Sequence, residues 1–207
     1  MCEPLSQGLR PVNDSLQLST KIIVAGGFGV GKTTFVGAIS EIPPVRTEAG
    51  ITAEGANVDN LSATPDKTST TVAMDFGRIS LETDLTLYLF GTPGQQRFSF
   101  MWDDLVRGAL GAVVLVDPRR LEDCFHAIDY FETQYQLPFL VAVNSFGDDG
   151  EGATYTLEQL RDALDLQAGV PIVWCDARDR DSVLRVLIAL VRNAMAVEMR
   201  GQSQLAS

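Results

Sequence analysis

A glycine-rich segment between a predicted strand and a predicted helix has the residue types that bind phosphate groups. It reads GGFGVGKTT from 26 to 34 and fits the pattern G-x-x-x-x-G-K-[ST]. Bare backbone N–H groups can approach a phosphate directly, and the following helix N-terminus adds free donors and a positive dipole. The pattern places Lys32 against the β- and γ-phosphates and the Thr33 hydroxyl on Mg²⁺. The predicted nucleotide contacts are Gly26, Gly27, Phe28, Gly29, Val30, Gly31, Lys32, Thr33 and Thr34.

The charge and composition of the chain restrict its partners. Its 207 residues carry a formal net charge of −11, and the pI is about 4.4. An acidic surface repels nucleic-acid backbones and gains nothing from an anionic membrane. Cys2, Cys124 and Cys175 are far apart in the sequence, and no apolar run reaches the roughly 18 residues of a membrane span. We therefore expect a cytoplasmic protein with reduced cysteines, no nucleic-acid partner and no direct membrane insertion.

Predicted strands and helices alternate along the chain. Strands are expected near 21–26, 72–81, 85–90, 113–116, 139–143 and 170–175, and helices near 31–40, 98–108, 120–134, from 156 onward, and 179–199. The short connection after the second strand predicts one antiparallel hairpin, and the alternation elsewhere predicts a doubly wound, mostly parallel six-stranded sheet. This α/β domain is expected over 20–200, between a flexible arm at 1–19 and a flexible tail at 201–207.

Three segments, at 25–34, 70–77 and 89–95, resemble motifs of Ras-like small GTPases, and most closely the GTP-binding proteins of actinobacterial conservons. The resemblance covers about 21–199 and implies a P-loop NTPase fold. It also implies a slow GTPase that acts as a nucleotide-dependent switch in signal transduction, with Mg²⁺ as cofactor and GTP or GDP as ligand. The implied partners are a roadblock/LC7 protein and a membrane sensor-kinase-like protein, which would recruit the chain to the membrane.

The segment GTPGQQRF at 91–98 resembles switch II, which reads DTAGQERF in many Ras-like proteins. The resemblance implies that the Gly94 N–H meets the γ-phosphate and that Gln95 orients the attacking water. Gly91 replaces an aspartate that holds Mg²⁺ through water, so either metal affinity is weaker or another carboxylate substitutes. Phe28 stands where Ras has glycine. Its ring either crowds the space of an inserted arginine and slows hydrolysis, or packs on the loop.

The segment TVAMDF at 71–76 resembles switch I of the Rab branch. The resemblance implies Thr71 as the second hydroxyl on Mg²⁺, with Thr70 as the next candidate and ordinary strand-entry threonines as the alternative. Residues 41–70 show no sustained periodicity, and so long a loop beside a phosphate site is typically functional. We expect 41–71 and 91–100 to become ordered together around a bound triphosphate.

The segment VNSFGD at 143–148 lies where the family carries Asn-Lys-x-Asp. Asn144 matches, and the lysine position holds serine. The carboxylate that would select guanine lies one residue late, at Asp148, with Asp149 as a further option.

The segment CDAR at 175–178 resembles the family motif Ser-Ala-Lys. The resemblance implies that the Ala177 N–H meets guanine O6 and that Arg178 covers the base. Both base motifs follow predicted strands, where ligands bind in such sheets.

Other functions stay open at this stage. The chain could be a nucleotide-dependent scaffold with negligible hydrolysis, or an ATP-binding P-loop protein. A MinD-like ATPase is disfavoured because that class has an extra lysine where this chain has Gly27. A small-molecule kinase is disfavoured because no arginine-rich lid segment is evident.

A partner surface and one histidine complete the predictions. Phe98, Phe100, Met101 and Trp102 are expected to be mostly core, although Phe100 lies off the main apolar stripe. The roadblock protein implied by the resemblance is expected to dock near Phe100 and Trp102, beside switch II. No arginine finger is evident, and Arg78 and Arg97 are the nearby candidates. His126, the only histidine, is expected to have a packing or surface role.

Overall fold

The structure is a computed structural model that describes residues 18–43, 45–49, 72–81, 85–94, 96–146 and 155–205. Its strands are β1 (Leu18–Gly26), β2 (Val45–Ala49), β3 (Val72–Leu81), β4 (Leu85–Gly91), β5 (Ala109–Val116), β6 (Phe139–Asn144) and β7 (Ile172–Cys175). Its α-helices are α1 (Lys32–Ile39), α2 (Trp102–Val106), α3 (Phe125–Asp129), α4 (Leu157–Ala163) and α5 (Arg180–Leu205). Two 3₁₀ segments, η3 (Gln96–Met101) and η4 (Leu121–Cys124), precede α2 and α3, and a π-helical segment, η5 (Tyr130–Gln134), follows α3.

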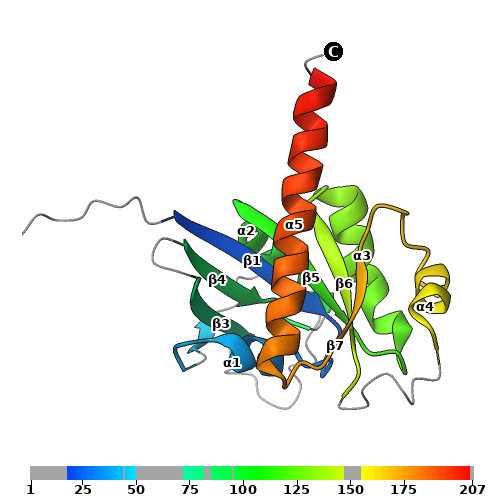
Figure 1. The fold of residues 1–207 in the computed structure, drawn as a ribbon. Coiled ribbons are helices and arrows are strands. Elements are labelled where there is room, and N and C mark those ends of the chain that lie inside the picture. The colour runs from blue at the N-terminus through cyan, green and yellow to red at the C-terminus, as the bar shows by residue number, and fades with distance from the viewer. Residues whose placement is uncertain are drawn as a thin grey trace, which may run out of the picture.

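The strands form a single sheet in the order β2-β3-β4-β1-β5-β6-β7 (Figure 1). Strand β1 pairs in parallel with β4 and β5, and β5-β6-β7 continue the parallel part. Strand β3 is antiparallel to both β2 and β4. The parallel strands therefore end along one edge, and the phosphate loop after β1 lies at the middle of that edge.

Helices cover both faces of the sheet, and the alternation along β1 determines which residues each face receives. Ile22 and Val24 belong to the core cluster under α1 and α5. Ile23 and Ala25 belong to the cluster under α2, α3 and α4. All four side chains are fully buried, so β1 is a rigid base for the loop that follows it.

The predicted fold class is confirmed. The six predicted strands are all present, and the short edge strand β2 adds to them within the segment predicted to lack structure. Pairing with β3 explains why periodicity did not reveal β2, because a five-residue edge strand needs little apolar pattern of its own. The helix expected from 156 onward is α4, and Thr156 is its N-cap, since its hydroxyl accepts the Gln159 N–H in a capping box.

The helices differ from the predictions in detail. The Tyr135 N–H bonds the Tyr130 carbonyl, so the helix predicted at 120–134 ends in a π-type turn, which buries the consecutive rings Tyr130 and Phe131. Helix α5 continues to Leu205 and projects beyond the sheet (Figure 1), so the tail expected at 201–207 begins as helix. Gly201 costs about 1 kcal/mol there, which the surrounding helix-forming residues offset. Among the described helices, none is long and apolar enough to cross a membrane.

Candidate phosphate-binding site

The loop between β1 and α1 has the backbone conformation that its glycines permit. Gly26 has φ 137°, and a Cβ there would lie 2.4 Å from the Leu115 carbonyl oxygen. Gly31, the residue before α1, has φ 108°. Side chains rarely adopt either conformation, so both positions favour glycine. The loop thus turns closely over the end of β5 and leads directly into the helix N-terminus.

The Lys32 side chain folds back over the loop. Its Nζ donates to the carbonyl oxygens of Gly26 at 2.8 Å and Gly27 at 2.7 Å. The side chain is 8% exposed, and burial lowers its pKa from 10.5 to about 8, although the Asp75 carboxylate opposes the shift. A phosphate group placed in the loop would add the anionic partner that this buried ammonium needs.

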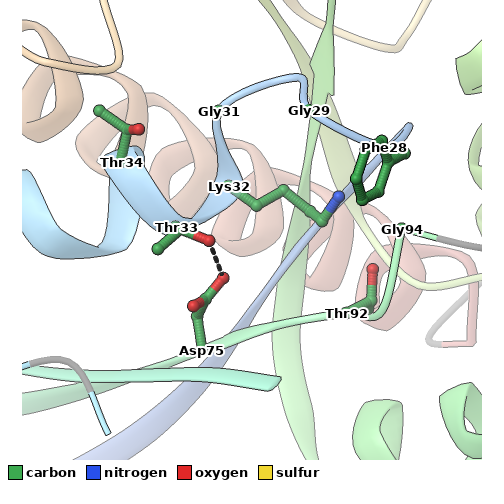
Figure 2. A pocket seen from close by; sticks show the side chains of 9 residues that line it. All are labelled: Phe28, Gly29, Gly31, Lys32, Thr33, Thr34, Asp75, Thr92 and Gly94. Atoms are coloured by element: carbon green, nitrogen blue, oxygen red, sulfur yellow. Dashed lines mark hydrogen bonds between the residues drawn. The ribbon is translucent and has the colours of Figure 1, made fainter. Parts of the chain in front are cut away.

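A cavity of about 340 Å³ lies in front of this lysine. It is bounded by the phosphate loop, the start of α1, β3 and the turn after β4, and Figure 2 shows the side chains around it. The lining residues are Phe28, Gly29, Gly31, Lys32, Thr33, Thr34, Asp75, Thr92 and Gly94. The structure thus brings the predicted phosphate loop together with Gly94, which sequence analysis assigned to the γ-phosphate.

Asp75 is a candidate site residue whose role is not evident from the sequence alone. It lies on β3, is 9% exposed, and accepts a hydrogen bond of 2.6 Å from the Thr33 hydroxyl at its Oδ2 (Figure 2). It pairs across the strands with Gly91. The signal available in the sequence was its place in the switch I-like segment, but only strand pairing shows which residue it faces.

The residues around the cavity fit a magnesium ion. A hydroxyl at Thr33 and a carboxylate at Asp75 are the hard oxygen donors that Mg²⁺ prefers, together with water and phosphate oxygens. Thr92 Oγ1 is buried and, among the residues that the structure describes, has no hydrogen-bond partner. A buried hydroxyl without a partner is costly, and a ligand or ordered water in the cavity would satisfy it.

Gly94 and Phe28 form the other side of the cavity. A Cβ at position 94 would lie 2.7 Å from Lys32 Nζ and 3.0 Å from the Phe28 Cα, so the segment that resembles switch II passes very close to the phosphate loop. The Phe28 ring is 68% exposed. Phe28 therefore stands at the cavity rim and does not pack on the loop.

Arg120 is an arginine beside the loop that sequence analysis missed. Its Nη2 donates to the Phe28 carbonyl oxygen at 3.3 Å, and ion pairs with Asp117 and Asp123 hold the guanidinium. Position 120 follows β5, whereas the arginines considered from the sequence were Arg78 and Arg97. Arg78 does not line the cavity, and the Arg97 side chain lies outside the described part of the structure.

On the base side, Asn144 connects the three segments expected to surround a nucleotide. Its Nδ2 donates to the Val30 carbonyl at 2.9 Å, and its Oδ1 accepts the N–H groups of Ala177 at 3.2 Å and Phe146 at 3.4 Å. Phe146 has the unusual positive φ of 53°. The hydrogen bond from its N–H to the Asn144 side chain two residues earlier stabilises this turn. Asn144 is thus a structural tie between the phosphate loop and the end of β7.

The other predicted base residues are only partly visible. The Ala177 N–H, predicted to meet guanine O6, donates to Asn144 in this structure. The Arg178 guanidinium, predicted to cover the base, makes two hydrogen bonds to Asp176, at 3.1 and 3.0 Å. Five residues named from the sequence lie outside the described part of the chain: Thr70, Thr71, Gln95, Asp148 and Asp149.

The surface beside switch II is smaller than expected. Trp102 is only 4% exposed and packs against His126, Tyr130 and Phe131. It belongs to the core and cannot contact a partner without rearrangement. Phe100 is 45% exposed and keeps its predicted place on the surface. His126 has the expected packing role.

The fold is shared with solved G domains of low sequence identity. The FeoB G-domain of Methanococcus jannaschii matches 86% of this chain and 98% of its own, with a TM-score of 0.56 and 17% identity. The G domain of the T. maritima FeoB iron transporter matches 86% and 99%, with a TM-score of 0.59 and 17% identity. The cytosolic domain of the same T. maritima transporter in a GDP form matches 86% and 64%, with a TM-score of 0.60 and 18% identity. The chain therefore has the fold of P-loop GTPase G domains.

Similarity in sequence gives the family. An uncharacterized protein of Methanocaldococcus jannaschii is 31% identical over 97 residues, which are 47% of this chain and 50% of that relative. The match thus spans about half the length of the relative. A family model described as "Conserved hypothetical ATP binding protein" matches residues 24–197, which is most of the chain. The chain belongs to this family of conserved hypothetical ATP-binding proteins.

Proposed function

We propose that the protein binds GTP and GDP with Mg²⁺ and acts as a nucleotide-dependent switch that hydrolyses GTP slowly. The observation that carries this proposal is the 340 Å³ cavity in which Lys32 and Thr33 of the phosphate loop face Asp75 and Gly94. A buried ammonium, a row of backbone donors at a helix N-terminus and an adjacent carboxylate are what a magnesium nucleotide requires.

Guanine is proposed over adenine on the basis of Asn144. It lies at the end of β6, beside the phosphate loop, where the Ras-like motif for guanine begins. The family description, ATP binding, favours adenine as the alternative. A MinD-like ATPase would have its extra lysine at position 27, but a Cβ there would lie 2.5 Å from the Asp123 Cβ. A lysine at this position would not fit without movement of η4.

Slow hydrolysis follows from two residues that a fast GTPase would not have. Gly91 supplies no carboxylate, and the exposed Phe28 ring stands at the rim where an activating arginine would have to enter. Hydrolysis then depends on Gln95 to position water. Arg120 is held by two carboxylates and the Phe28 carbonyl, so it would have to leave these contacts before it could reach a γ-phosphate.

The switch itself is proposed to involve 41–71 and 91–100. Gly94 lies close to both Lys32 and Phe28, so a γ-phosphate entering there would displace or fix switch II. Thr71 would close over the metal from switch I. By the conservon resemblance, a roadblock protein would read this change at Phe100, and a sensor-kinase-like protein would recruit the complex to the membrane.

Single-turnover hydrolysis of GTP tests the proposal. We expect slow but measurable hydrolysis by the wild-type protein. In Gln95→Leu it should slow roughly ten- to a hundredfold with GTP affinity retained, because water positioning is lost while ground-state contacts remain. Gln96→Leu, the same change at the next residue, is the matched control and should hydrolyse at the wild-type rate.

Three results would contradict parts of this proposal. No hydrolysis by the wild-type protein would leave a nucleotide-dependent scaffold. Equal rates in Gln95→Leu and Gln96→Leu would remove Gln95 from the reaction. Hydrogen exchange that is identical in the GDP complex and in a complex with a non-hydrolysable GTP analogue would show that the bound protein does not switch.

A further inference from the structure

The structure places a carboxylate where the switch II segment lacks one. Position 91, at the end of β4, is glycine, and its neighbour across the strands is Asp75 on β3. A Cβ at position 91 would lie 3.0 Å from the Asp75 Cβ and 3.2 Å from its Oδ2. The Asp75 side chain therefore uses the space that a side chain at position 91 would need, and it reaches the same cavity from the adjacent strand.

The Asp75 carboxylate faces the phosphate loop, while its backbone pairs with Arg46 on β2 and Gly91 on β4. Its Oδ2 accepts the Thr33 hydroxyl at 2.6 Å, and its charge acts on Lys32 strongly enough to oppose the effect of burial on that residue. The Lys32 ammonium donates its hydrogen bonds to the Gly26 and Gly27 carbonyls. Asp75 is thus a buried carboxylate on the cavity wall, and the hydrogen bond that the structure describes for it comes from the Thr33 hydroxyl. A buried carboxylate is stable only beside a cation or strong donors.

We infer that Asp75 has taken over the role of the missing aspartate and anchors the hydrated magnesium ion of the nucleotide. The inference rests on the proposed function, since it concerns the metal that accompanies the nucleotide. The pair Asp75 and Gly91 is a swap across two paired strands: the carboxylate moves from β4 to β3, and the glycine makes room for it. Asp75 is a metal-positioning residue in this account and does not contact the reacting atoms.

A purely structural role for Asp75 is the competing explanation, and it makes a different prediction. If Asp75 only accepted the Thr33 hydroxyl, an asparagine would serve equally well, because its amide oxygen accepts the same bond. A metal anchor needs the negative charge. Asp75→Asn therefore separates the two roles, with Asp162→Asn on the exposed face of α4 as the matched control for the change in net charge.

The experiment measures binding of methylanthraniloyl-GDP by fluorescence over a Mg²⁺ titration with EDTA-treated protein. In the wild-type protein and in Asp162→Asn, we expect Mg²⁺ to tighten nucleotide binding. In Asp75→Asn, the Mg²⁺ concentration that gives half of the maximal tightening should be 10- to 100-fold higher than in the wild-type protein. This is the usual loss of metal affinity when a metal site loses a supporting carboxylate. Binding without Mg²⁺ should not weaken in Asp75→Asn, because the phosphate loop is intact and the change removes a negative charge from beside the phosphates.

A rescue variant makes the inference more specific. Asp75→Gly combined with Gly91→Asp returns the carboxylate to β4 and removes the Cβ that would obstruct it. We expect this double variant to regain most of the Mg²⁺ dependence that Asp75→Gly alone loses. Circular dichroism confirms the fold of each variant. If Asp75→Asn does not fold, Asp75→Ser gives the same test, because serine can also accept the Thr33 hydroxyl without a charge.

The outcomes distinguish this inference from the proposed function. A folded Asp75→Asn or Asp75→Ser with wild-type Mg²⁺ dependence overturns the role of Asp75. Wild-type protein that binds the labelled GDP equally well with and without Mg²⁺ also overturns it, and leaves nucleotide binding standing. Wild-type protein that binds no nucleotide at any Mg²⁺ concentration overturns the proposed function and this inference with it.

Discussion

The two ends of the candidate nucleotide site are built differently. At the phosphate end, backbone groups, a buried lysine and the Thr33–Asp75 pair are arranged by one continuous strand–loop–helix unit and its neighbouring strands. At the base end, Asn144 is in place, but the Ala177 N–H and the Arg178 guanidinium are bonded to protein groups. Lys32 and Thr33 are also bonded to protein groups, but they line one open cavity. We therefore expect the phosphates to supply most of the binding free energy and recognition of the base to depend on rearrangement.

Removal of the Lys32 charge should have the largest effect, and it should be confined to the phosphate end. Lys32→Ala removes charge-assisted hydrogen bonds worth roughly 1.5–3 kcal/mol each, so we expect affinity for GDP to fall at least about a hundredfold. Equilibrium binding of labelled GDP measures this loss. Lys21→Ala on β1, whose ammonium lies over the Phe90 ring, is the control and should bind normally. A folded Lys32→Ala protein that binds GDP tightly would remove the phosphate-loop assignment.

Asn144 connects the two ends, so its loss should affect both stability and affinity. Asn144→Ala leaves the Val30 carbonyl and the N–H groups of Phe146 and Ala177 without their partner. We expect the free energy of unfolding to fall by roughly 2–4 kcal/mol, measured by urea denaturation.

Ser145→Ala is the matched control for this change. The Ser145 backbone N–H already bonds the Cys175 carbonyl, and that bond does not involve the side chain. Ser145→Ala should therefore lower the free energy of unfolding by less than about 0.5 kcal/mol. Equal stability of the Asn144 and Ser145 variants would mean that the two ends of the site are held together by other contacts.

The pH dependence of binding gives a smaller effect that is specific to Lys32. Bound phosphates stabilise the ammonium, so its pKa in the complex must lie above the value of about 8 in the free protein. Nucleotide binding should therefore take up a proton above pH 8, and affinity should fall by up to about tenfold per pH unit there and stay constant below pH 7. Calorimetry in buffers of different ionisation enthalpy measures this proton uptake.

The same pKa predicts the opposite trend for stability. An unfolded lysine keeps its proton up to the ordinary pKa of 10.5, whereas the buried Lys32 loses it near 8. The unfolded state thus binds more protons between these values, and this residue should make the free energy of unfolding rise as pH increases from 8 to 10.5. Affinity that does not change between pH 7 and 9.5 would contradict the lowered pKa.

The strand, loop and helix at the phosphate end could be located from the sequence because they are local. The glycines, Lys32 and Thr33 lie in one short segment, and the strand and helix around it have clear apolar patterns. Asp75 was not predicted as a site residue, because its role depends on which residue of β4 it faces. The apolar spacing predicted Trp102 to be mostly core, and contacts with α3 and η5 do bury it, so only its additional assignment to the docking region is wrong. Long-range pairing and packing of this kind are not encoded in local spacing.

Base selectivity is the measurement that tests the central claim most directly. GTP, GDP, ATP and ADP should each be titrated against labelled GDP bound to the wild-type protein with Mg²⁺. We predict that all four compete, because the phosphate end is common to them, and that the guanine nucleotides bind more tightly by roughly 1–3 kcal/mol. Asp148→Ala should reduce that preference. Binding of ATP as tight as GTP or tighter would contradict the guanine assignment, and competition by none of the four would contradict nucleotide binding itself.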